Sequence, residues 1–331
     1  MTTMTFSLRG TGIGLPGKRV SSAALDRDIG KREGWLEAAC GVRERYVCGA
    51  EAQDELAAVA ARDAITEAGI PAASIDLLIF ASAVPKYSIP TTAPLIARHL
   101  GIPNGVCATL DVNSTCLSFL SGFDIATTMI SAGRYRHALV VCSEIASRAL
   151  PWRTDPATAG LFGDGAAAAV LTAPEVNEAS SIRAILFETH HDGYEACRLA
   201  AGGTGIDFHR EPERFAAGSY FQMSGRDLFR LTAARFPGYV DRLLERAQWR
   251  HQDVDVVIPH QASALAHLVK RCGFAKERVV DIVRDHGNQV AASIPSALHL
   301  ARRQGRINRG SKVLLLGTSA GVAFGGIAIE M

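Results

Sequence analysis

The same sequence patterns occur in the same order in the two halves of this 331-residue chain. In the first half, Cys116 precedes an apolar helical pattern that ends at Gly133, and a strand pattern follows. In the second half, Asn288 precedes a helical pattern that ends at Gly305, again with a strand pattern after it. Cys116 and Asn288 each lie 17 residues before that glycine, so we expect them to occupy equivalent positions. Such a repeat predicts two copies of one structural unit within one fold.

A second repeat upstream supports the same interpretation. Ile75-Asp-Leu-Leu-Ile79 and Val254-Asp-Val-Val-Ile258 are short apolar runs, and each follows a helical pattern. Strands that alternate with helices favour mainly parallel β-sheets covered by helices, so the predicted fold class is α/β. A polar run that begins at Ala173 separates the halves, and we expect one unit at residues 1–173 and another at 174–331.

Composition narrows the range of functions. The net charge is +2, from 35 basic and 33 acidic residues, which gives no overall attraction to nucleic acid. Seven cysteines without a CxxC pair favour a reducing compartment and argue against a structural zinc or other metal site. We see no secretory signal and no apolar run near the roughly 20 residues that span a bilayer. A cytoplasmic protein without a membrane or nucleic-acid partner is therefore expected.

Cys116 is the candidate nucleophile. It follows the strand pattern 109–112 and stands at the first turn of the helical pattern 117–132, where Asp124 is the only ionisable residue. A helix that is apolar nearly all round is buried, so the thiol should lie near the centre of the protein. A helix N-terminus lowers a thiol pKa, and the thiolate is the nucleophilic form. The alternative is a small core residue, and the other six cysteines are interpreted as packing or surface thiols.

His260 and Asn288 are candidate hydrogen-bond donors. His260 follows the strand pattern 254–258, and side chains at the carboxyl ends of parallel strands face the crevice where ligands bind. Asn288 lies in a turn before a helix, where a helix cap is the alternative role. Neutral His and Asn offer donors without negative charge, which suits an oxyanion or an enolate formed by loss of carbon dioxide. The order Cys, His, Asn also occurs in papain-like proteases, but their C-G-[SA]-C-[WY] box is absent around Cys116.

A set of motifs spread along the whole chain matches one known family. The motifs are Gly41-Val-Arg-Glu-Arg45, Thr115-Cys116, Phe162-Gly-Asp-Gly-Ala-Ala-Ala-Ala-Val-Leu171, Pro259-His-Gln-Ala262, His286-Gly-Asn288 with Ala291-Ala-Ser-Ile-Pro295, and the Gly-rich tail 319–326. In this combination they are strongly specific, and the chain resembles the β-ketoacyl-acyl carrier protein synthase III family of the thiolase superfamily.

This resemblance implies a fold and a reaction. The fold would be two thiolase-like βαβαβαββ halves that form a five-layered αβαβα core, assembled as a homodimer. In the implied Claisen condensation, acyl-CoA acylates Cys116, and a malonyl thioester, carried by acyl carrier protein, then loses carbon dioxide. His260 and Asn288 would hold the thioester oxygen, and backbone N–H groups of Cys116 and Ala320 would form the oxyanion hole. The product would be a 3-oxoacyl thioester for fatty acid or related secondary-metabolite biosynthesis, and no cofactor is implied because acyl-CoA is a substrate.

The chain departs from the family at several implied binding residues. Pro156 stands where an arginine packs on the coenzyme A adenine opposite Trp35, so either Arg153 replaces it or the acyl donor is held in another way. Ile89 matches a position that reaches across the dimer into the acyl pocket, often as Phe, which predicts chains longer than acetyl. Ala320 replaces a glycine and would disturb the tail loop if a positive φ were needed there. The implied substrate set is Trp35, Ile89, Arg153, Leu161, Phe162, Met223, Phe229 and Ser263, and the implied carrier-protein docking residues are Lys270 and Arg271.

Two other activities remain open on the same fold. A related Claisen enzyme that does not decarboxylate carries a glutamate before the proline that matches Pro90, whereas this chain has Ile89. An acyltransferase, or a partner subunit without catalysis, often lacks the Cys or the Asn, whereas this chain keeps Cys116 and Asn288. The pattern therefore favours condensation, with coenzyme A as the alternative carrier of the malonyl group.

Overall fold

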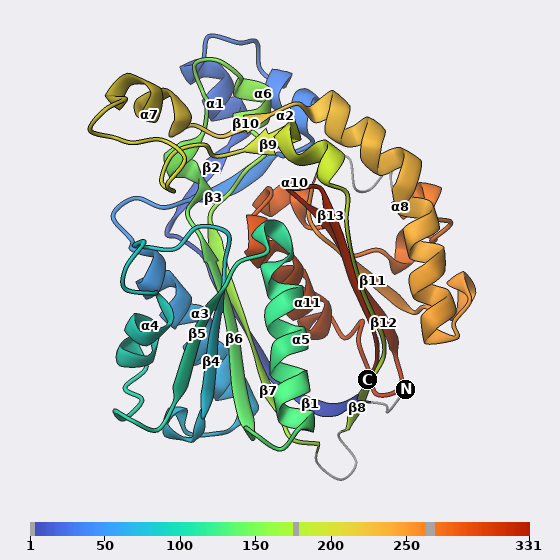
Figure 1. The fold of residues 1–331 in the computed structure, drawn as a ribbon. Helices are drawn as coiled ribbons and strands as arrows, with labels where there is room; N and C mark the ends of the chain where they lie inside the picture. The colour runs from blue at the N-terminus through green and yellow to red at the C-terminus, as the bar shows by residue number, and fades with distance from the viewer. Residues whose placement is uncertain (1–3, 175–178, 263–268) are drawn as a thin grey trace.

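The computed structural model describes residues 4–174, 179–262 and 269–331. One sheet contains β1 (Met4–Gly14), β4 (Leu77–Ala81), β5 (Ala108–Val112), β6 (His137–Glu144), β7 (Gly165–Thr172), β8 (Ser180–Thr189), β11 (Val256–Pro259), β12 (Lys312–Ser319) and β13 (Ala323–Glu330). Its strand order is β11-β12-β13-β8-β1-β7-β6-β4-β5 (Figure 1). In the first half, β5, β4 and β6 are parallel neighbours, and β7 and β1 follow them as antiparallel strands.

The second half repeats the strand order of the first. β11 and β12 are parallel neighbours, and β13 and β8 follow as antiparallel strands. The strands β8, β11, β12 and β13 therefore correspond to β1, β4, β6 and β7. An isolated parallel bridge from Val257 to Val279 stands beside β11, where β5 stands beside β4 in the first half. The two halves join where Met4 to Phe6 of β1 pair with residues 180–182 of β8.

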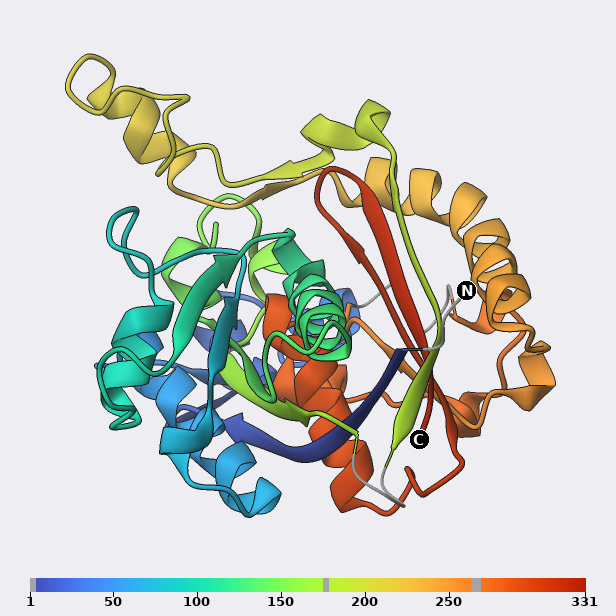
Figure 2. The same ribbon diagram turned by 60° about the horizontal axis from the view of Figure 1, so that its bottom comes forward.

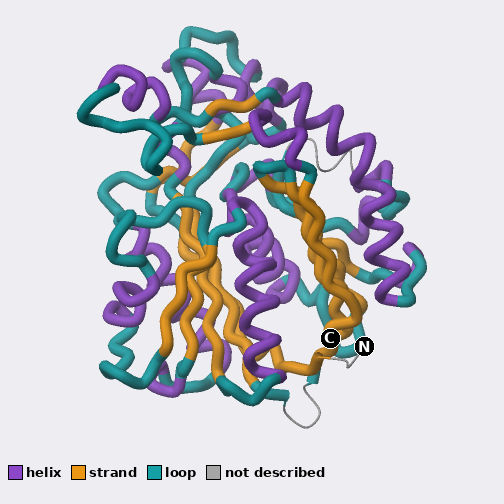
Figure 3. The backbone as a smooth tube through the Cα atoms, viewed as in Figure 1, coloured by secondary structure: helices purple, strands orange, loops and turns teal. Residues whose placement is uncertain are grey.

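Helices form three layers around the two halves of the sheet (Figures 1 and 3). α3 (Gln53–Ala68) and α4 (Ala93–His99) cover the outer face of the first half, and α8 (Gly225–Ala247) covers that of the second. α5 (Ser118–Ser131) and α11 (Ser293–Arg303) lie between the halves. The layers follow the order αβαβα, which confirms the predicted α/β fold with duplicated thiolase-like halves.

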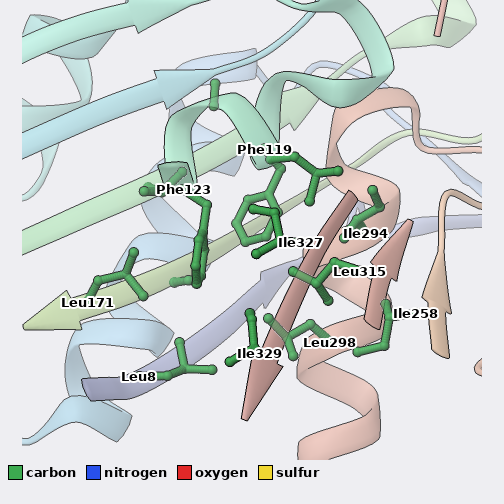
Figure 4. Packing of buried hydrophobic residues seen from close by; sticks show 14 of the residues in the cluster. Leu8, Phe119, Phe123, Leu171, Ile258, Ile294, Leu298, Leu315, Ile327 and Ile329 are labelled. Atoms are coloured by element: carbon green, nitrogen blue, oxygen red, sulfur yellow. The ribbon is translucent and has the colours of Figure 1, made fainter. Parts of the chain in front are cut away.

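The central layer forms a large hydrophobic core (Figure 4). Phe119 and Phe123 of α5 lie with ring centroids 5.8 Å apart, and Ile294 of α11 and Leu315 of β12 belong to the same cluster. All four side chains are fully buried, and each such burial stabilises the fold by about 1.5–3 kcal/mol. The predicted burial of the helix after Cys116 is thus confirmed, and its packing fixes the end of the helix that carries the thiol.

Shorter elements cover the carboxyl edge of the sheet. They are β2 (Lys18–Ser21), α1 (Ser22–Asp28), α2 (Trp35–Cys40), β3 (Glu44–Val47), α6 (Pro156–Ala159), β9 (Cys197–Arg198), α7 (Pro212–Gly218), β10 (Gln222–Met223) and α10 (Val283–His286). The stretch 190–218, expected to be a long functional insertion, contains β9, α7 and the 3-10 helix η4 (His191–Ala196). In Figure 2, α7 projects away from the layered body of the molecule.

The turns before α5 and α11 have the same hydrogen-bond pattern. Asn113 Oδ1 accepts a hydrogen bond from Thr115 N at 2.8 Å, and Asn288 Oδ1 accepts one from Val290 N at 2.8 Å. Thr115 and Val290 have positive φ angles of 51° and 50°, a conformation that costs a non-glycine residue about 1–3 kcal/mol. Each then begins a 3-10 turn, η2 (Thr115–Leu117) in the first half and η7 (Val290–Ala292) in the second.

This register corrects the equivalence expected from the sequence. Asn288 corresponds to Asn113, and the counterpart of Cys116 is Ala291. The shared spacing of 17 residues arises because α5 has 14 residues and α11 has 11, so Gly305 comes three positions early. The prediction of two like units is right, whereas the prediction that Cys116 and Asn288 share one place is wrong.

The upstream repeat matches in detail. Asp76 Oδ1 accepts a hydrogen bond from His137 N at 2.9 Å, where β6 begins. Asp255 Oδ2 accepts one from Lys312 N at 2.8 Å, where β12 begins. Equivalent aspartates therefore join equivalent pairs of strands in the two halves.

Candidate active site

The candidate residues follow strands that end at one edge of the sheet. β5 leads into η2 with Cys116, β6 ends at Glu144, β11 leads to His260, and β12 leads to Ala320. η2 of the first half contacts both η7 and β12 of the second half. The loops of the two halves therefore meet at the carboxyl edge, where α/β proteins bind ligands.

A glycine in β12 allows the two halves to approach closely. A Cβ added at Gly317 would lie 2.7 Å from Leu117 Cδ2 and 3.3 Å from His260 Cβ. Leu117 directly follows Cys116, so one backbone position touches both the nucleophile turn and the histidine. The structure thus brings together residues that are far apart in the sequence.

Cys116 lies in η2 and is half-buried as a residue. Burial raises its pKa well above the ordinary value, and nearby Cys197 and Glu144 raise it further as negative charges. The sequence predicted a pKa lowered by the helix N-terminus, and that prediction is wrong, because loss of solvation outweighs the helix dipole here. Burial therefore favours the neutral thiol, whose proton must leave when the sulfur is acylated.

His260 is 3% exposed and is held by its backbone, whose N–H donates to Leu316 O at 2.7 Å. Burial lowers the pKa of the imidazole to about 4, so the ring is neutral at physiological pH. Its Nδ1 is buried and has no partner among the residues that the structure describes. A neutral ring carries one N–H donor, which matches the uncharged donor expected at this position.

Asn288 is 5% exposed, and the oxygen and nitrogen of its side-chain amide differ in their hydrogen bonding. Its Oδ1 accepts hydrogen bonds from Val290 N at 2.8 Å and Ser293 Oγ at 3.3 Å, so the amide caps the turn before α11. Its Nδ2 donates to no residue within the described ranges. The cap that was weighed as an alternative role is therefore present, and it leaves the N–H₂ group available for a ligand.

Ala320 lies in the turn between β12 and β13. The positive φ in this turn is at Gly321, where φ is 128°, and Ala320 is not among the residues with positive φ. The replacement of glycine by Ala320 thus needs no left-handed backbone. Ser319 Oγ donates to Ala320 O at 3.2 Å, which holds the turn from its own side.

Three residues of the implied acyl pocket lie beside the site. Leu161 O accepts a hydrogen bond from Asn288 N at 2.8 Å, and Phe162 forms an isolated bridge with Asn288; both are buried. Met223 of β10 is paired with Cys197 of β9, one of the groups that raise the pKa of Cys116. These contacts place the predicted apolar residues next to the Asn288 turn and the thiol.

The other implied binding residues are more exposed. Trp35 begins α2, and Lys31 Nζ lies 5.2 Å from the centre of its ring. Phe229 of α8 is 37% exposed. The remaining members are Arg153, Lys270 and Arg271, which are exposed, and Ser263, which lies outside the described residues.

Ile89 stands at the tip of an anchored loop. It is 89% exposed, and Tyr87 in the same loop is 56% exposed. Lys86 N donates to Thr92 Oγ1 at 3.2 Å across the base of the loop, and Thr92 N donates to Asp111 Oδ2 at 2.7 Å. The loop is thus held at its base while two large apolar side chains face solvent in the single chain.

Sequence reasoning missed two residues of the site, Glu144 and Cys197. The rule that selected His260, a polar residue at the carboxyl end of a parallel strand, applies equally to Glu144 at the end of β6. No sequence signal marks Cys197, because it comes from β9, a two-residue strand inside the insertion.

No group of three or more His, Cys, Asp or Glu side chains within residues 4–174, 179–262 and 269–331 could hold a metal ion. Over the same ranges, none of the helices combines the length and the apolar character needed to span a bilayer. All seven cysteines are free thiols.

Comparisons with known proteins agree with the fold and the site. The family model for 3-oxoacyl-[acyl-carrier-protein] synthase III matches residues 110–193, and that for its C-terminal part matches residues 244–331. A beta-ketoacyl-[acyl-carrier-protein] synthase III of Neisseria meningitidis serogroup C / serotype 2a is 34% identical over 331 residues, which cover 98% of each chain. One from Rhizorhabdus wittichii is 36% identical over 324 residues, which cover 97% of this chain and 98% of that protein.

Solved structures show the same relationship. The crystal structure of 3-oxoacyl-[acyl-carrier-protein] synthase III from Aquifex aeolicus VF5 has a TM-score of 0.87 at 30% identity and covers 98% of this chain and 100% of that one. A variant of Xanthomonas campestris OleA shares the fold, with a TM-score of 0.87 at 24% identity over 100% of both chains. The fold and site define an acyltransferase of the thiolase type. The chain belongs to the 3-oxoacyl-[acyl-carrier-protein] synthase III family, as its motifs suggested.

Proposed function

We propose that the chain condenses an acyl-CoA starter with malonyl-acyl carrier protein, releases carbon dioxide and forms a 3-oxoacyl product, with Cys116 as the acyl carrier. The observation that supports this most directly is a pair of uncharged donors in the second half, where η7 and β12 contact the Cys116 turn. His260 is held neutral by burial, and Asn288 uses its Oδ1 for the turn and leaves its Nδ2 without a described partner. Such donors stabilise negative charge that develops on an oxygen. Coenzyme A enters as part of the substrate, and no cofactor takes part.

In the first half-reaction, the sulfur of Cys116 attacks the thioester carbonyl of acyl-CoA. The backbone N–H groups of Cys116 and Ala320 would stabilise the oxyanion of the tetrahedral intermediate. The C–S bond to coenzyme A then breaks, and the coenzyme A sulfur takes up the proton that the Cys116 thiol loses. Because burial raises the pKa of this thiol, proton loss and attack must be coupled.

In the second half-reaction, a malonyl thioester loses carbon dioxide and leaves an enolate. The enolate oxygen would accept hydrogen bonds from His260 and from Asn288 Nδ2. The enolate carbon attacks the acyl carbonyl on Cys116, a C–C bond forms, and the C–S bond to Cys116 breaks. The Cys116 sulfur takes up one proton from solution, and the 3-oxoacyl thioester leaves.

Intact-mass spectrometry with a panel of acyl-CoA esters tests the acyl carrier. Wild-type protein should gain one acyl group, and Cys116→Ala should gain none. Cys272→Ala is the matched control, because Cys272 is a buried free thiol in the outer core around α8. Full acylation of Cys116→Ala would overturn the assignment. Acylation without release of carbon dioxide from the malonyl thioester would instead support a plain acyltransferase.

We also propose a homodimer in which Ile89 of one subunit limits the acyl pocket of the other. Ile89, Tyr87 and Leu110 are exposed apolar side chains, and Leu110 belongs to β5, the edge strand of the sheet. Unpaired edge strands invite pairing with another chain. Light scattering should give twice the mass of one chain, and a monomer would refute this part.

Further assignments follow the same reasoning. Lys270 and Arg271 are exposed cations and would dock the acidic carrier protein, whereas Trp35 and Arg153 would hold coenzyme A. The two units would be residues 1–173 and 174–331, since β7 ends at Thr172 and β8 begins at Ser180. Seven free thiols support a location in the reducing cytoplasm.

A further inference from the structure

Glu144 is a buried acid that the mechanism above does not use. It ends β6 and is 3% exposed. Its Oε1 accepts a hydrogen bond from Ala83 N at 2.6 Å, and the backbone N–H groups of Ala83, Ala291 and Val84 counteract the rise of its pKa on burial. Burying an acid is unfavourable unless donors satisfy it, so backbone N–H groups gathered around one carboxyl group indicate a specific contact.

One side of this contact leads to Cys116. The carbonyl oxygen of Ala83 accepts a hydrogen bond from Asn113 Nδ2 at 2.8 Å, and Asn113 Oδ1 accepts one from Thr115 N at 2.8 Å. Thr115 keeps its φ of 51° directly before the nucleophile, a conformation that only the surroundings can impose. A chain of hydrogen bonds therefore runs from Glu144 to the residue that aims the thiol.

The other side leads to Asn288. Ala291 belongs to η7 and follows Val290, whose N–H is held by Asn288 Oδ1. Glu144 comes from the first half of the chain and Ala291 from the second. Glu144 therefore binds a loop of its own half through Ala83 N, and β6, which it ends, contacts η7 of the other half.

We propose that Glu144 is a positioning residue that holds the Cys116 turn and the Asn288 turn in register. This inference rests on the proposed function, since it assigns the two turns to the two half-reactions. Gln at this position would offer one acceptor oxygen and an NH₂ group that faces backbone donors, so at least one hydrogen bond would be lost. Asp would keep both acceptor oxygens on a side chain that is one methylene shorter.

The charges around Glu144 give a readout that a purely structural role would not affect. The neighbouring titratable groups are Cys116, Cys142 on the same strand and Asp164. Burial raises the pKa of Glu144 to about 8, although its hydrogen bonds to backbone N–H groups lower it. Above a pH of about 8, Glu144 carries a negative charge that raises the pKa of Cys116, so its removal should lower that pKa. Each unit of decrease raises the thiolate fraction about tenfold at a pH below both values.

The experiment compares wild type with Glu144→Gln, Glu144→Asp and the control Asp76→Asn. Asp76 accepts two backbone N–H groups at the opposite end of β6, so the control removes a similar anchor far from the site. The measurements are single-turnover acylation, carbon dioxide release and the pH profile of Cys116 alkylation by iodoacetamide. Glu144→Gln should slow both half-reactions by about tenfold or more and move alkylation to lower pH. Glu144→Asp should slow both less and keep the wild-type alkylation profile, and Asp76→Asn should behave as wild type.

Two results would overturn the proposal. One is normal rates in both half-reactions for Glu144→Gln, and the other is lost rates with an unchanged alkylation profile. If circular dichroism shows that Glu144→Gln does not fold, Glu144→Asp decides, since normal rates in both half-reactions for that variant would also refute the role. Alkylation needs neither acyl-CoA nor a malonyl thioester, so its result stands even if the proposed function fails.

Discussion

Replacing Asn288 should separate the two half-reactions. Its Nδ2 is the proposed donor to the enolate, and its Oδ1 holds Val290 N at 2.8 Å and Ser293 Oγ at 3.3 Å. Asn288→Ala removes both functions. Loss of one oxyanion donor costs about 10²–10³ in rate, or about 2.7–4 kcal/mol of transition-state stabilisation. Loss of the Oδ1 cap costs about 1 kcal/mol of folding stability, because two donors lose their acceptor.

Asn288→Asp separates these contributions. The carboxylate keeps an acceptor for Val290 N and Ser293 Oγ but has no N–H₂ donor, and its charge opposes an enolate. Both variants should therefore accept an acyl group on Cys116 at rates within severalfold of wild type. Both should release carbon dioxide from a malonyl thioester about a hundredfold or more slowly.

The assay is rapid-quench acylation followed by single-turnover release of labelled carbon dioxide, with thermal unfolding measured in parallel. Asn308→Ala is a matched control, because Asn308 is exposed and its Nδ2 only donates to Gly305 O at 3.0 Å. Near-normal decarboxylation by Asn288→Asp would show that the amide donor is not needed and would refute the reasoning. Equal loss of acylation and decarboxylation in both variants would show that Asn288 acts only through the turn.

Three further predictions concern pH, chain length and stability. Burial lowers the pKa of His260 to about 4, so decarboxylation against pH should show no inflection near the ordinary histidine value of 6.5. The contribution of His260 should be lost only as pH drops through about 4, and an inflection near 6.5 would contradict this. Ile89→Phe should shorten the preferred acyl chain and leave acetyl turnover nearly intact, and an unchanged chain-length profile would show that this residue does not limit the pocket. Gly12→Ala should lower the free energy of unfolding by about 1–3 kcal/mol or more, because the added Cβ would lie 2.1 Å from Ala60 O. In the control Gly17→Ala, the added Cβ meets only one side-chain atom, at 3.7 Å. Equal stabilities of the two variants in calorimetry would be inconsistent with this packing.

The sequence predicts the elements well because their patterns are local. The apolar run 117–132 has one ionisable residue, Asp124, and α5 spans Ser118–Ser131 in the central layer. The repeated aspartates Asp76 and Asp255 stand before equivalent strands and make equivalent hydrogen bonds. The periodicity of apolar residues and the signals that begin and end helices carry this information directly.

Properties of the site that depend on several segments could not be predicted in the same way. The pKa of Cys116 is set by burial, Cys197 and Glu144, which belong to distant parts of the chain, so the local helix-dipole argument gave the wrong direction. The equivalence of Cys116 with Asn288 failed for a similar reason. Counting residues from Asn288 to Gly305 cannot show that α11 is three residues shorter than α5, or that the loop after α11 is longer than the loop after α5.

The two matching turns also bear on how a duplicated chain came to have one reactive centre rather than two. Asn113 and Asn288 make the same cap, but Asn113 Nδ2 is bound to Ala83 O, whereas Asn288 Nδ2 has no partner in the described part of the chain. The thiol of one copy is matched by the methyl group of Ala291 in the other. After duplication, each copy could therefore lose half of the chemistry while both kept the geometry. Selection then preserves the turn with Asn113 because it orients the nucleophile. Selection preserves the turn with Asn288 because it leaves a hydrogen-bond donor unused by the protein. Mutational scanning should find that homologous positions in the two turns tolerate different substitutions.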